Sequence, residues 1–155
     1  MELTERDRLL LDCLQDNAQI TNAELAEKVD LSTSGVQKRL KKLAEQGVIK
    51  NYVTVLDRKA VGYDMLCFVE VILRVHDSEQ VHLFDEKVQT QPEIQECHRL
   101  TGNSDYLLKV VVRDREHLDH FLMEVLLPLP AVDRVHTRIV LKEIKETSKV
   151  ATVLP

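Results

Sequence analysis

The sequence lacks the features that mark membrane, secreted or disulfide-bonded proteins. No apolar run in its 155 residues approaches the length that a helix needs to cross a bilayer. The opening segment, MELTERDRLL, carries acidic side chains and lacks the basic-then-apolar order of a signal peptide. The three cysteines are odd in number and widely spaced, with no CxxC pair, which indicates reduced thiols. We therefore expect a cytoplasmic protein that makes no contact with a membrane.

An overall excess of positive charge is also missing, because the formal net charge is −5. That value argues against nucleic-acid binding until the charges are located. Residues 1–60 hold ten basic and ten acidic residues, whereas residues 61–155 hold eleven and sixteen. Residues 32–50 carry five basic residues against one acidic residue. This local excess is typical of a nucleic-acid contact, and the acidic remainder should keep non-specific DNA affinity modest.

The basic segment predicts a capped helix with two different faces. Ser32 has a hydroxyl that suits a helix N-cap, and Gly47 suits the left-handed residue after a last turn. Four apolar residues between them recur at helical spacing and form one buried stripe. The opposite face fits either an ordinary solvated surface or contacts to phosphates and base edges in a major groove. Its polar residues are Ser34, Gln37, Lys38, Lys41 and Lys42.

Two shorter helices are expected before this one. Thr4 with Asp7, and Thr21 with Glu24, have the spacing of a capping box that begins a helix. Asp30 lies in a tight connection between the second helix and the third. Two short helices, a brief turn and a longer helix with polar outward residues are the arrangement of a helix-turn-helix.

The residues after Gly47 predict a wing and then a linker. The segment VIKNYVTVLD is rich in β-formers and suggests two strands with Asn51 in the turn, which would bring Lys50 or Tyr52 to backbone phosphate. We therefore expect a winged helix-turn-helix domain over residues 1–57. Residues 58–64 lose periodicity and are interpreted as a linker.

Residues 65–155 have the pattern of an α+β domain. The expected elements are a strand at 65–75, a helix from Ser78 to Pro92, strands at 94–101 and 105–112, a helix from Asp114 to Pro128, and a strand at 132–144. This β-α-β-β-α-β order is the ferredoxin-like split unit. The first strand is apolar on both faces, yet the helices of such a sheet cover only one. An uncovered apolar face requires a second subunit, so the pattern predicts a dimer.

Residues spread over nearly the whole chain occur in the same order in a known family. They are Asp7, Leu10, Leu11, Leu14, Leu25, Ala26, Leu31, Ser32, Arg39, Leu40, Leu43, Gly47, Val48, Ile49, Gly102, Asp105, Tyr106, Leu127 and Pro128. In combination they resemble the Lrp/AsnC group (leucine-responsive regulatory protein/asparagine regulator) of transcription regulators. Three positions depart from its pattern: Gln19 replaces a common arginine, and Asp30 and Asn51 replace frequent glycines. These departures affect phosphate contact and wing shape.

The resemblance implies a sequence-specific DNA-binding regulator that is not an enzyme. Its N-terminal domain would bind double-stranded DNA, and its C-terminal domain would serve ligand sensing and dimerisation. The ligand would be a small amino acid, and no cofactor is implied. Family members usually form dimers that assemble further into tetramers or octamers.

The expected DNA contacts lie on the third helix and just after it. Gln37 suits an adenine edge, and Lys38 or Lys41 suits guanine or phosphate. Arg39 lies on the flank of the helix, where it can instead pair with an acid of the first helices. A dimer would read a two-fold site with half-sites one helical turn apart. The full set is Ser32, Thr33, Ser34, Gln37, Lys38, Arg39, Lys41, Lys42, Lys50 and Tyr52.

The resemblance places the effector at the loop between the two central strands. Gly102 permits an unusual backbone whose N–H groups can receive a carboxylate, and Asp105 can pair with an ammonium group. The plain alternative is a turn that Asp105 fixes by hydrogen bonding. Few charges lie near the loop, so leucine or methionine is the expected ligand. The predicted lining residues are Leu100, Thr101, Gly102, Asn103, Ser104, Asp105, Tyr106, Val135, His136, Thr137 and Ile139.

Two residue pairs could suggest a metal site or a catalytic nucleophile. His117 and His120 have helical spacing for a metal site, but no third ligand is suitably placed, so we expect a solvated face and no metal. Cys97 and His98 are neighbours in a strand and therefore point to opposite faces, which argues against a nucleophile pair.

Two rival functions stay open from the sequence. Some chains with this architecture, sirohaem decarboxylases among them, resemble these regulators yet act on tetrapyrroles, although the basic helix argues against that interpretation. A nucleoid-like DNA organiser without an effector is the second rival.

Overall fold

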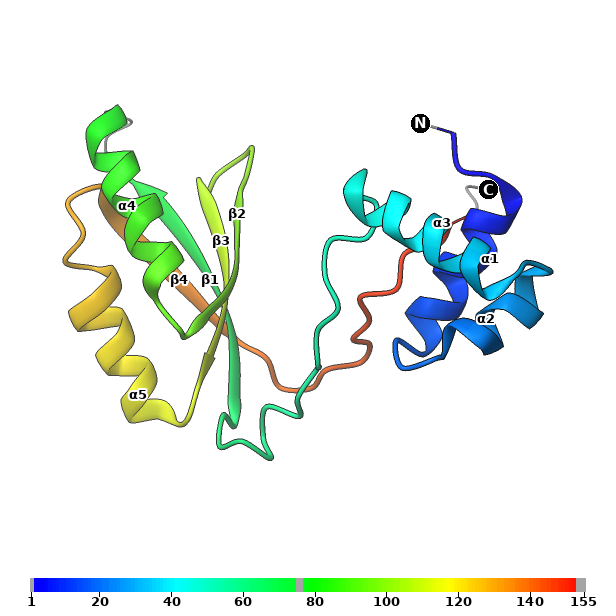
Figure 1. Ribbon diagram of the computed structural model, residues 1–155. Coiled ribbons are helices and arrows are strands. Elements are labelled where there is room, and N and C mark those ends of the chain that lie inside the picture. The colour runs from blue at the N-terminus through cyan, green and yellow to red at the C-terminus, as the bar shows by residue number, and fades with distance from the viewer. Residues whose placement is uncertain (1, 75–76, 153–155) are drawn as a thin grey trace. The chain divides into compact units, whose positions relative to one another are not determined.

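The computed structural model describes residues 2–74 and 77–152. Its helices and strands fall into two compact units, one of residues 1–54 with the C-terminal segment 145–155, and one of residues 55–144. The helical unit contains α1 (Glu5–Asp16), α2 (Asn22–Val29) and α3 (Thr33–Glu45) (Figure 1).

Local side-chain caps begin all three helices, as predicted. The Thr4 hydroxyl accepts from the Asp7 backbone N–H at 3.2 Å, and the Asp7 carboxylate accepts from Thr4 in return. Thr21 and Glu24 form the same reciprocal box at α2. Ser32 Oγ accepts from Gly35 N at 3.1 Å and begins α3. Three N-terminal donors that a helix would otherwise leave without a partner are thus satisfied by side chains three residues away.

Apolar residues from all three helices meet in one small core. Its members are Leu10, Leu25, Ala26, Val29 and Val36. The turn between α2 and α3 is tight because Asp30 takes a left-handed conformation with φ +51°. Gly47 has φ +72° after α3, as its glycine predicted. Packing the apolar stripe of α3 into this core leaves its polar face outward.

The predicted strands of the wing are not formed. Residues 48–64 contain no strand, and Tyr52, Val53 and Val55 are exposed there. A two-stranded ribbon is only marginally stable unless its apolar side packs on something, and these side chains stay in solvent. The predicted linker instead folds back on itself, where Arg58 Nη1 donates to the carbonyl of Tyr63 at 2.8 Å.

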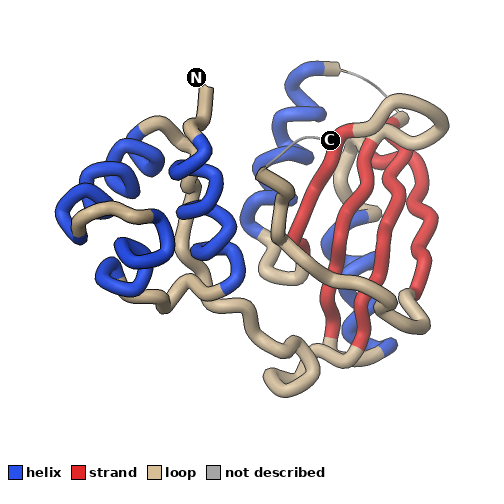
Figure 2. The backbone as a smooth tube through the Cα atoms, turned by 90° about the vertical axis from the view of Figure 1, so that its right-hand side faces the viewer, coloured by secondary structure: helices blue, strands red, loops and turns tan. Residues whose placement is uncertain are grey.

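The second unit has the predicted β-α-β-β-α-β order. Its elements are β1 (Met65–Leu73), α4 (Ser78–Thr90), β2 (Ile94–Arg99), β3 (Tyr106–Val112), α5 (Arg115–His120), the π-helix η1 (Phe121–Leu126) and β4 (Val132–Ile139). The strands form one antiparallel sheet in the order β2-β3-β1-β4 (Figure 2). Helices α4 and α5 lie on one side of it (Figure 1). Two details differ from expectation: Asp77, not Ser78, is the N-cap of α4, and the helix from Asp114 ends in a π turn.

The side of the sheet opposite the helices, here called the open face, is less apolar than predicted. Its apolar residues are Leu66, Phe68, Ile72, Leu107 and Val111. Charged pairs lie among them, with Arg138 Nε 3.0 Å from Glu70 Oε1 and Lys109 Nζ 3.2 Å from Glu96 Oε1. The sequence pattern of β1 alone missed them, because three of these four residues come from other strands of the sheet.

The C-terminal segment also differs from expectation. The sequence predicts that the second domain runs to residue 155, whereas the described residues 145–152 belong with the helical unit. The reason is a set of hydrogen bonds to α1 from residues that have no helical or strand pattern of their own.

Candidate nucleic-acid interface and effector loop

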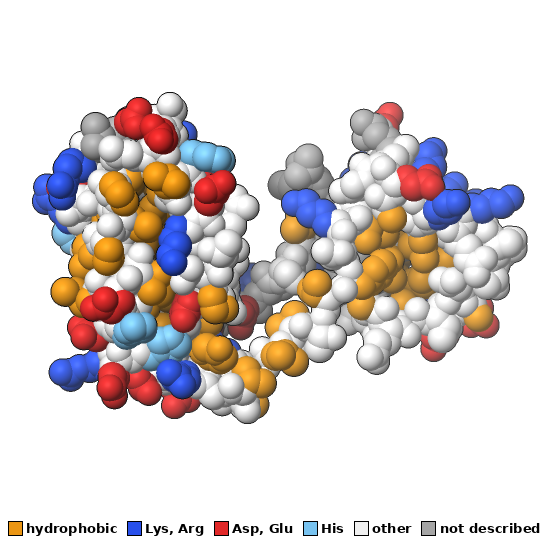
Figure 3. Space-filling model, turned by 60° about the vertical axis from the view of Figure 1, so that its left-hand side comes forward, with side chains coloured by type: hydrophobic (Ala, Val, Ile, Leu, Met, Phe, Trp, Pro, Cys, Tyr) orange, Lys and Arg blue, Asp and Glu red, His pale blue; other side chains and the backbone are white. Residues whose placement is uncertain are grey.

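The outer face of α3 collects the predicted DNA-contacting side chains. Lys and Arg side chains project from the helical unit (Figure 3). Lys41 Nζ lies 3.8 Å from Glu45 Oε1, but both side chains are largely exposed, so this pair leaves the lysine available at the surface. The exposed members of the predicted set are Ser32, Thr33, Ser34, Gln37, Lys38, Lys41, Lys42, Lys50 and Tyr52. Ser32 is the N-cap of α3 and the next six lie in that helix, whereas Lys50 and Tyr52 lie on the segment after it.

The start of α3 carries three consecutive hydroxyl side chains. The hydroxyls of Ser32 and Ser34 lie 3.2 Å apart, and Thr33 begins the helix beside them. A Cβ added at Gly35 would lie 3.2 Å from Ser32 Oγ, so glycine lets the cap approach closely. Backbone N–H groups and hydroxyls at a helix N-terminus favour phosphate.

Arg39 differs from the other predicted DNA contacts because it is bound to the start of α1. Its Nη1 donates to Asp7 Oδ1 at 2.6 Å and to Thr4 Oγ1 at 3.1 Å. Burial acts to raise the pKa of Asp7, but the hydrogen bonds from Thr4 and Arg39 outweigh it and hold that pKa below its usual value. The ion pair to the first helix, which the sequence left open as the alternative for Arg39, is therefore present. Contact of Arg39 with DNA stays a prediction.

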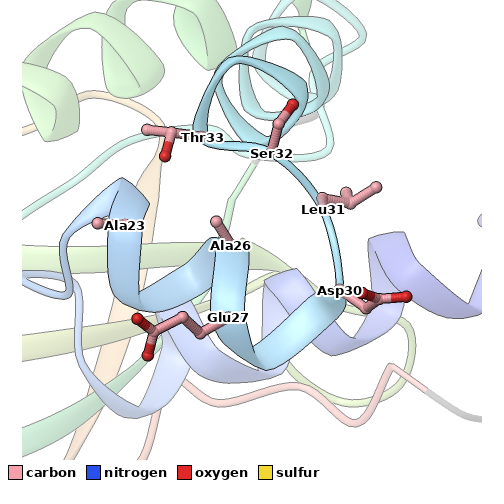
Figure 4. A pocket seen from close by; sticks show the side chains of 7 residues that line it. All are labelled: Ala23, Ala26, Glu27, Asp30, Leu31, Ser32 and Thr33. Atoms are coloured by element: carbon pink, nitrogen blue, oxygen red, sulfur yellow. The ribbon is translucent and has the colours of Figure 1, made fainter.

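A shallow hollow between α2 and α3 is a feature that sequence reasoning missed. Figure 4 shows the residues that line it: Ala23, Ala26, Glu27, Asp30, Leu31, Ser32 and Thr33. Two of them, Glu27 and Asp30, are carboxylates, whereas Ser32 and Thr33 are hydroxyl residues at the start of α3. The hollow marks the turn of the helix-turn-helix, and the basic side chains of α3 are not among its lining.

The effector loop is held by hydrogen bonds of Asp105. Its Oδ2 accepts from Leu73 N at 2.8 Å, its N–H donates to Val71 O at 2.9 Å, and its carbonyl accepts from Leu100 N at 2.8 Å. These bonds tie the loop to the end of β1. Asp105 therefore fixes the loop by hydrogen bonding, which is the kind of role that the sequence left open as the alternative to ligand contact. Gly102 has φ +122°, a conformation that a side chain would strain.

The predicted lining residues divide between the two faces of the sheet. Tyr106 is buried, with its ring 4.8 Å from that of Phe84, so it is a core residue. Burial raises the pKa of Tyr106, and the nearby Asp85 raises it further. On β4, the register puts Val135, Thr137 and Ile139 on the helix-covered side.

His136 is the one predicted β4 residue on the open face. It pairs in register with Glu70. Glu70 Oε1 lies 3.0 Å from Arg138 Nε, and Glu70 Oε2 accepts from the Ser104 hydroxyl at 3.5 Å. Glu70 and Arg138 were not among the residues predicted from the sequence. A lone glutamate inside the otherwise apolar run of β1 is the pattern that indicates a charged partner on another strand.

The other candidate pairs have structural partners. His117 Nε2 lies 3.0 Å from Glu93 Oε1, and its Nδ1 accepts from the Arg113 backbone. Among the described residues, no group of three or more His, Cys, Asp or Glu side chains is arranged to hold a metal ion. Cys97 faces the helices and His98 the open face, as alternation predicts.

No helix within residues 2–74 and 77–152 is long and apolar enough to span a membrane.

Two family models match the two halves of the chain. The description "Winged helix-turn-helix DNA-binding" matches residues 3–50, and "Lrp/AsnC ligand binding domain" matches residues 66–150. The first range contains α1 to α3, and the second contains all of the sheet except Met65, the first residue of β1.

Relatives and solved structures agree over almost the full length. The transcriptional regulator AzlB of Bacillus subtilis is 37% identical over 148 residues, covering 96% of this chain and 94% of that protein. The leucine-responsive regulatory protein of Escherichia coli is 36% identical, covering 96% and 90%. A Neisseria meningitidis transcriptional regulator solved with L-methionine superposes with a TM-score of 0.92 at 34% identity, covering 96% of each chain. The chain belongs to the Lrp/AsnC family, and it is a DNA-binding transcriptional regulator with an amino-acid ligand-binding domain.

Proposed function

We propose that α3 reads the major groove with Gln37, Lys38 and Lys41, while Ser32 to Ser34 and Lys42 contact phosphate. The observation that carries this proposal is the division of α3, whose apolar side is buried in the helical core and whose cationic side is exposed. Lys50 and Tyr52 are supporting phosphate contacts. Arg39 has a different role, because it holds α3 against α1.

We further propose that the effector is methionine or leucine. A free amino acid carries one ammonium and one carboxylate, and the Glu70–Arg138 pair beside Ser104 offers the opposite charge to each. Backbone N–H groups around Gly102 can also donate hydrogen bonds to a carboxylate. The Neisseria regulator solved with L-methionine and the leucine-responsive relatives support an apolar amino acid of this size.

The regulator would act as a cytoplasmic homodimer that assembles into tetramers or octamers, without catalysis. The apolar centre of the open face suits a second copy of the chain. An amino acid that binds one assembly better than another shifts the population toward it, and that shift changes how recognition helices are spaced on DNA.

The experiment measures DNA affinity and assembly mass with and without each common amino acid. We expect methionine or leucine to change at least one of the two quantities and to raise the melting temperature. A protein that binds DNA without sequence preference and responds to no amino acid would instead be a DNA organiser. A Soret shift on adding a tetrapyrrole would support the enzyme alternative.

A further inference from the structure

A second hollow in the helical unit lies between the start of α1 and the flank of α3, and is here called the α1–α3 pocket. Its volume is about 350 Å³. The residues that line it and carry the argument are Thr4 and Asp7 from the start of α1, and Lys38, Arg39, Lys42 and Gln46 from α3 and its end. Arg39, Lys42 and Gln46 recur at three- and four-residue spacing, so they lie in one row along the helix. This row runs beside the outer face of α3, because Lys38 belongs to both the pocket and that face.

Arg39 lines this pocket with most of its hydrogen-bond donors unused. A guanidinium has five N–H groups, two of them on Nη1. Nη1 of Arg39 donates to Asp7 Oδ1 at 2.6 Å and to Thr4 Oγ1 at 3.1 Å, so both of its N–H groups are used. Among residues 2–74 and 77–152, Nε and Nη2 of Arg39 have no hydrogen-bond partner. Because the Arg39 side chain is 33% exposed, a ligand can reach these remaining donors from solvent.

The charges of the pocket favour an anion. Three cationic side chains line it against two carboxylates, those of Glu2 and Asp7. The Asp7 carboxylate already accepts from Arg39, which lessens its repulsion of an anion. Lys38 and Lys42 are exposed, and neither forms an ion pair with any residue that the structure describes. Two ammonium groups and the remaining donors of a guanidinium therefore line one pocket.

A backbone phosphate of DNA is the anion expected at this position. A helix that lies in the major groove has a row of phosphates along each flank, and contacts to those phosphates fix the orientation of the protein on the duplex. The pocket lies on one flank of α3, beside the face that carries Lys38. The neighbouring N–H groups on Nε and Nη2 of Arg39 suit two oxygens of one phosphate, which is the fork geometry that an arginine offers and a lysine does not.

We infer that the α1–α3 pocket binds one phosphate of the DNA backbone through Arg39 and Lys42, and that Asp7 is a positioning residue that orients the guanidinium for this contact. The inference rests on the proposed placement of α3 in the major groove. It adds a phosphate site on the flank of that helix, and it gives Arg39 a second role beyond holding α3 against α1.

The phosphate site is tested on a duplex selected from random sequence by the full-length protein, in which one phosphate at a time is replaced by an uncharged methylphosphonate. We expect a position in each half-site where the replacement weakens binding of the original protein at least about five-fold, and weakens binding of Arg39→Gln and Lys42→Gln less than about two-fold. Lys87→Gln on α4 is the control and should keep every penalty. Penalties that equal those of the original at every position, in both pocket variants, overturn the site. Lys42→Gln leaves the Asp7–Arg39 pair intact, so it decides the matter if Arg39→Gln does not fold.

The positioning role of Asp7 is tested at the same phosphate. Asp7→Asn keeps an oxygen that can accept from Arg39 Nη1, whereas Asp7→Ala does not. We expect the penalty at the Arg39-dependent position to stay within about two-fold of the original in Asp7→Asn, and to fall to less than about half in Asp7→Ala, with the other positions unchanged. General destabilisation of the helical unit would change all positions together. A uniform change, or an undiminished penalty in Asp7→Ala, overturns the positioning role.

Failure of the base-reading proposal can be told apart from failure of the pocket. If the original protein selects no sequence, the proposed base contacts fail, and the pocket is decided on a random-sequence duplex by the slope of log affinity against log salt concentration. A phosphate contact of Arg39 requires that slope to decrease by about one unit in Arg39→Gln, and equal slopes overturn the site. Calorimetry with inorganic phosphate separates DNA from a free anion. Phosphate binding that is lost in Arg39→Gln, with no Arg39-dependent effect on any duplex, would assign the pocket to a free anion and overturn the inference.

Discussion

Asp7 of α1 and Arg39 of α3 join the cap of one helix to the flank of another, with Oδ1 and Nη1 2.6 Å apart. The same carboxylate accepts from Thr4 in the capping box. One side chain therefore begins α1 and holds the recognition helix against it. This arrangement directs one of the basic residues of α3 toward α1, unlike the lysines of the proposed DNA-contacting face.

The Asp7–Arg39 pair should contribute stability that depends on pH. Because the pKa of Asp7 is lowered in the folded state, its contribution is present above the ordinary value of 3.8 and is lost as pH falls below it. We expect Asp7→Asn to lower the free energy of unfolding at pH 7 by about 1–2 kcal/mol. Urea titrations at pH 7 and pH 3 measure this, with Glu5→Gln as the control in the same turn. A loss that is equal at both pH values contradicts the assignment.

Lys42 and Gln37 should affect DNA binding in different ways. A phosphate-contacting lysine adds about one unit to the salt dependence of affinity, so Lys42→Ala should reduce the slope by about that amount. Gln37→Ala should instead relax the preference at one base pair, by about 1–3 kcal/mol of discrimination. Affinities for a defined operator and its single-base variants, at several salt concentrations, separate the two. Lys87→Ala on α4 is the control and should leave both quantities unchanged.

Tyr106 should behave as a core residue. Its ring packs 4.8 Å from Phe84, so Tyr106→Ala should cost about 3–5 kcal/mol of unfolding free energy, as large core truncations do. Tyr106→Phe keeps the ring and should leave the affinity for an amino acid within two-fold, on the order expected for a residue outside the site. Denaturant titration and isothermal calorimetry test the two variants. A large loss of ligand affinity in Tyr106→Phe would return this residue to the effector site.

The open face should be the surface through which two copies associate. Phe68 lies in its centre, so Phe68→Glu places a charge where an apolar contact is expected and should shift the dimer toward monomer. Sedimentation velocity at several concentrations measures the shift, and Lys87→Glu on the helix side is the control. If Phe68→Glu keeps the original mass while Lys87→Glu does not, the helix side is the interface.

Local interactions explain the parts of the fold that sequence reasoning predicted. The capping boxes of Thr4 and Thr21 join residues three apart, so their pattern is visible in the sequence itself. Gly47 and the apolar periodicity of α3 are equally local, and they suffice to place Gln37 and Lys38 on its outer face. The two predicted wing strands are not formed, because such strands are stable only when their apolar side packs against other residues, and the apolar side chains Tyr52, Val53 and Val55 are exposed.

The sequence by itself thus determined the helix-turn-helix, the order of the sheet elements and the polar face of α3, because caps and periodicity act over a few residues. Only the tertiary structure decided the partner of Arg39, the inward position of Tyr106, the Glu70–Arg138 pair and the docking of Val150 on Gln15. These contacts join residues that lie far apart in the chain, up to 135 positions for Gln15 and Val150. Such pairs depend on which faces the folded elements bring together, and no local pattern records that choice.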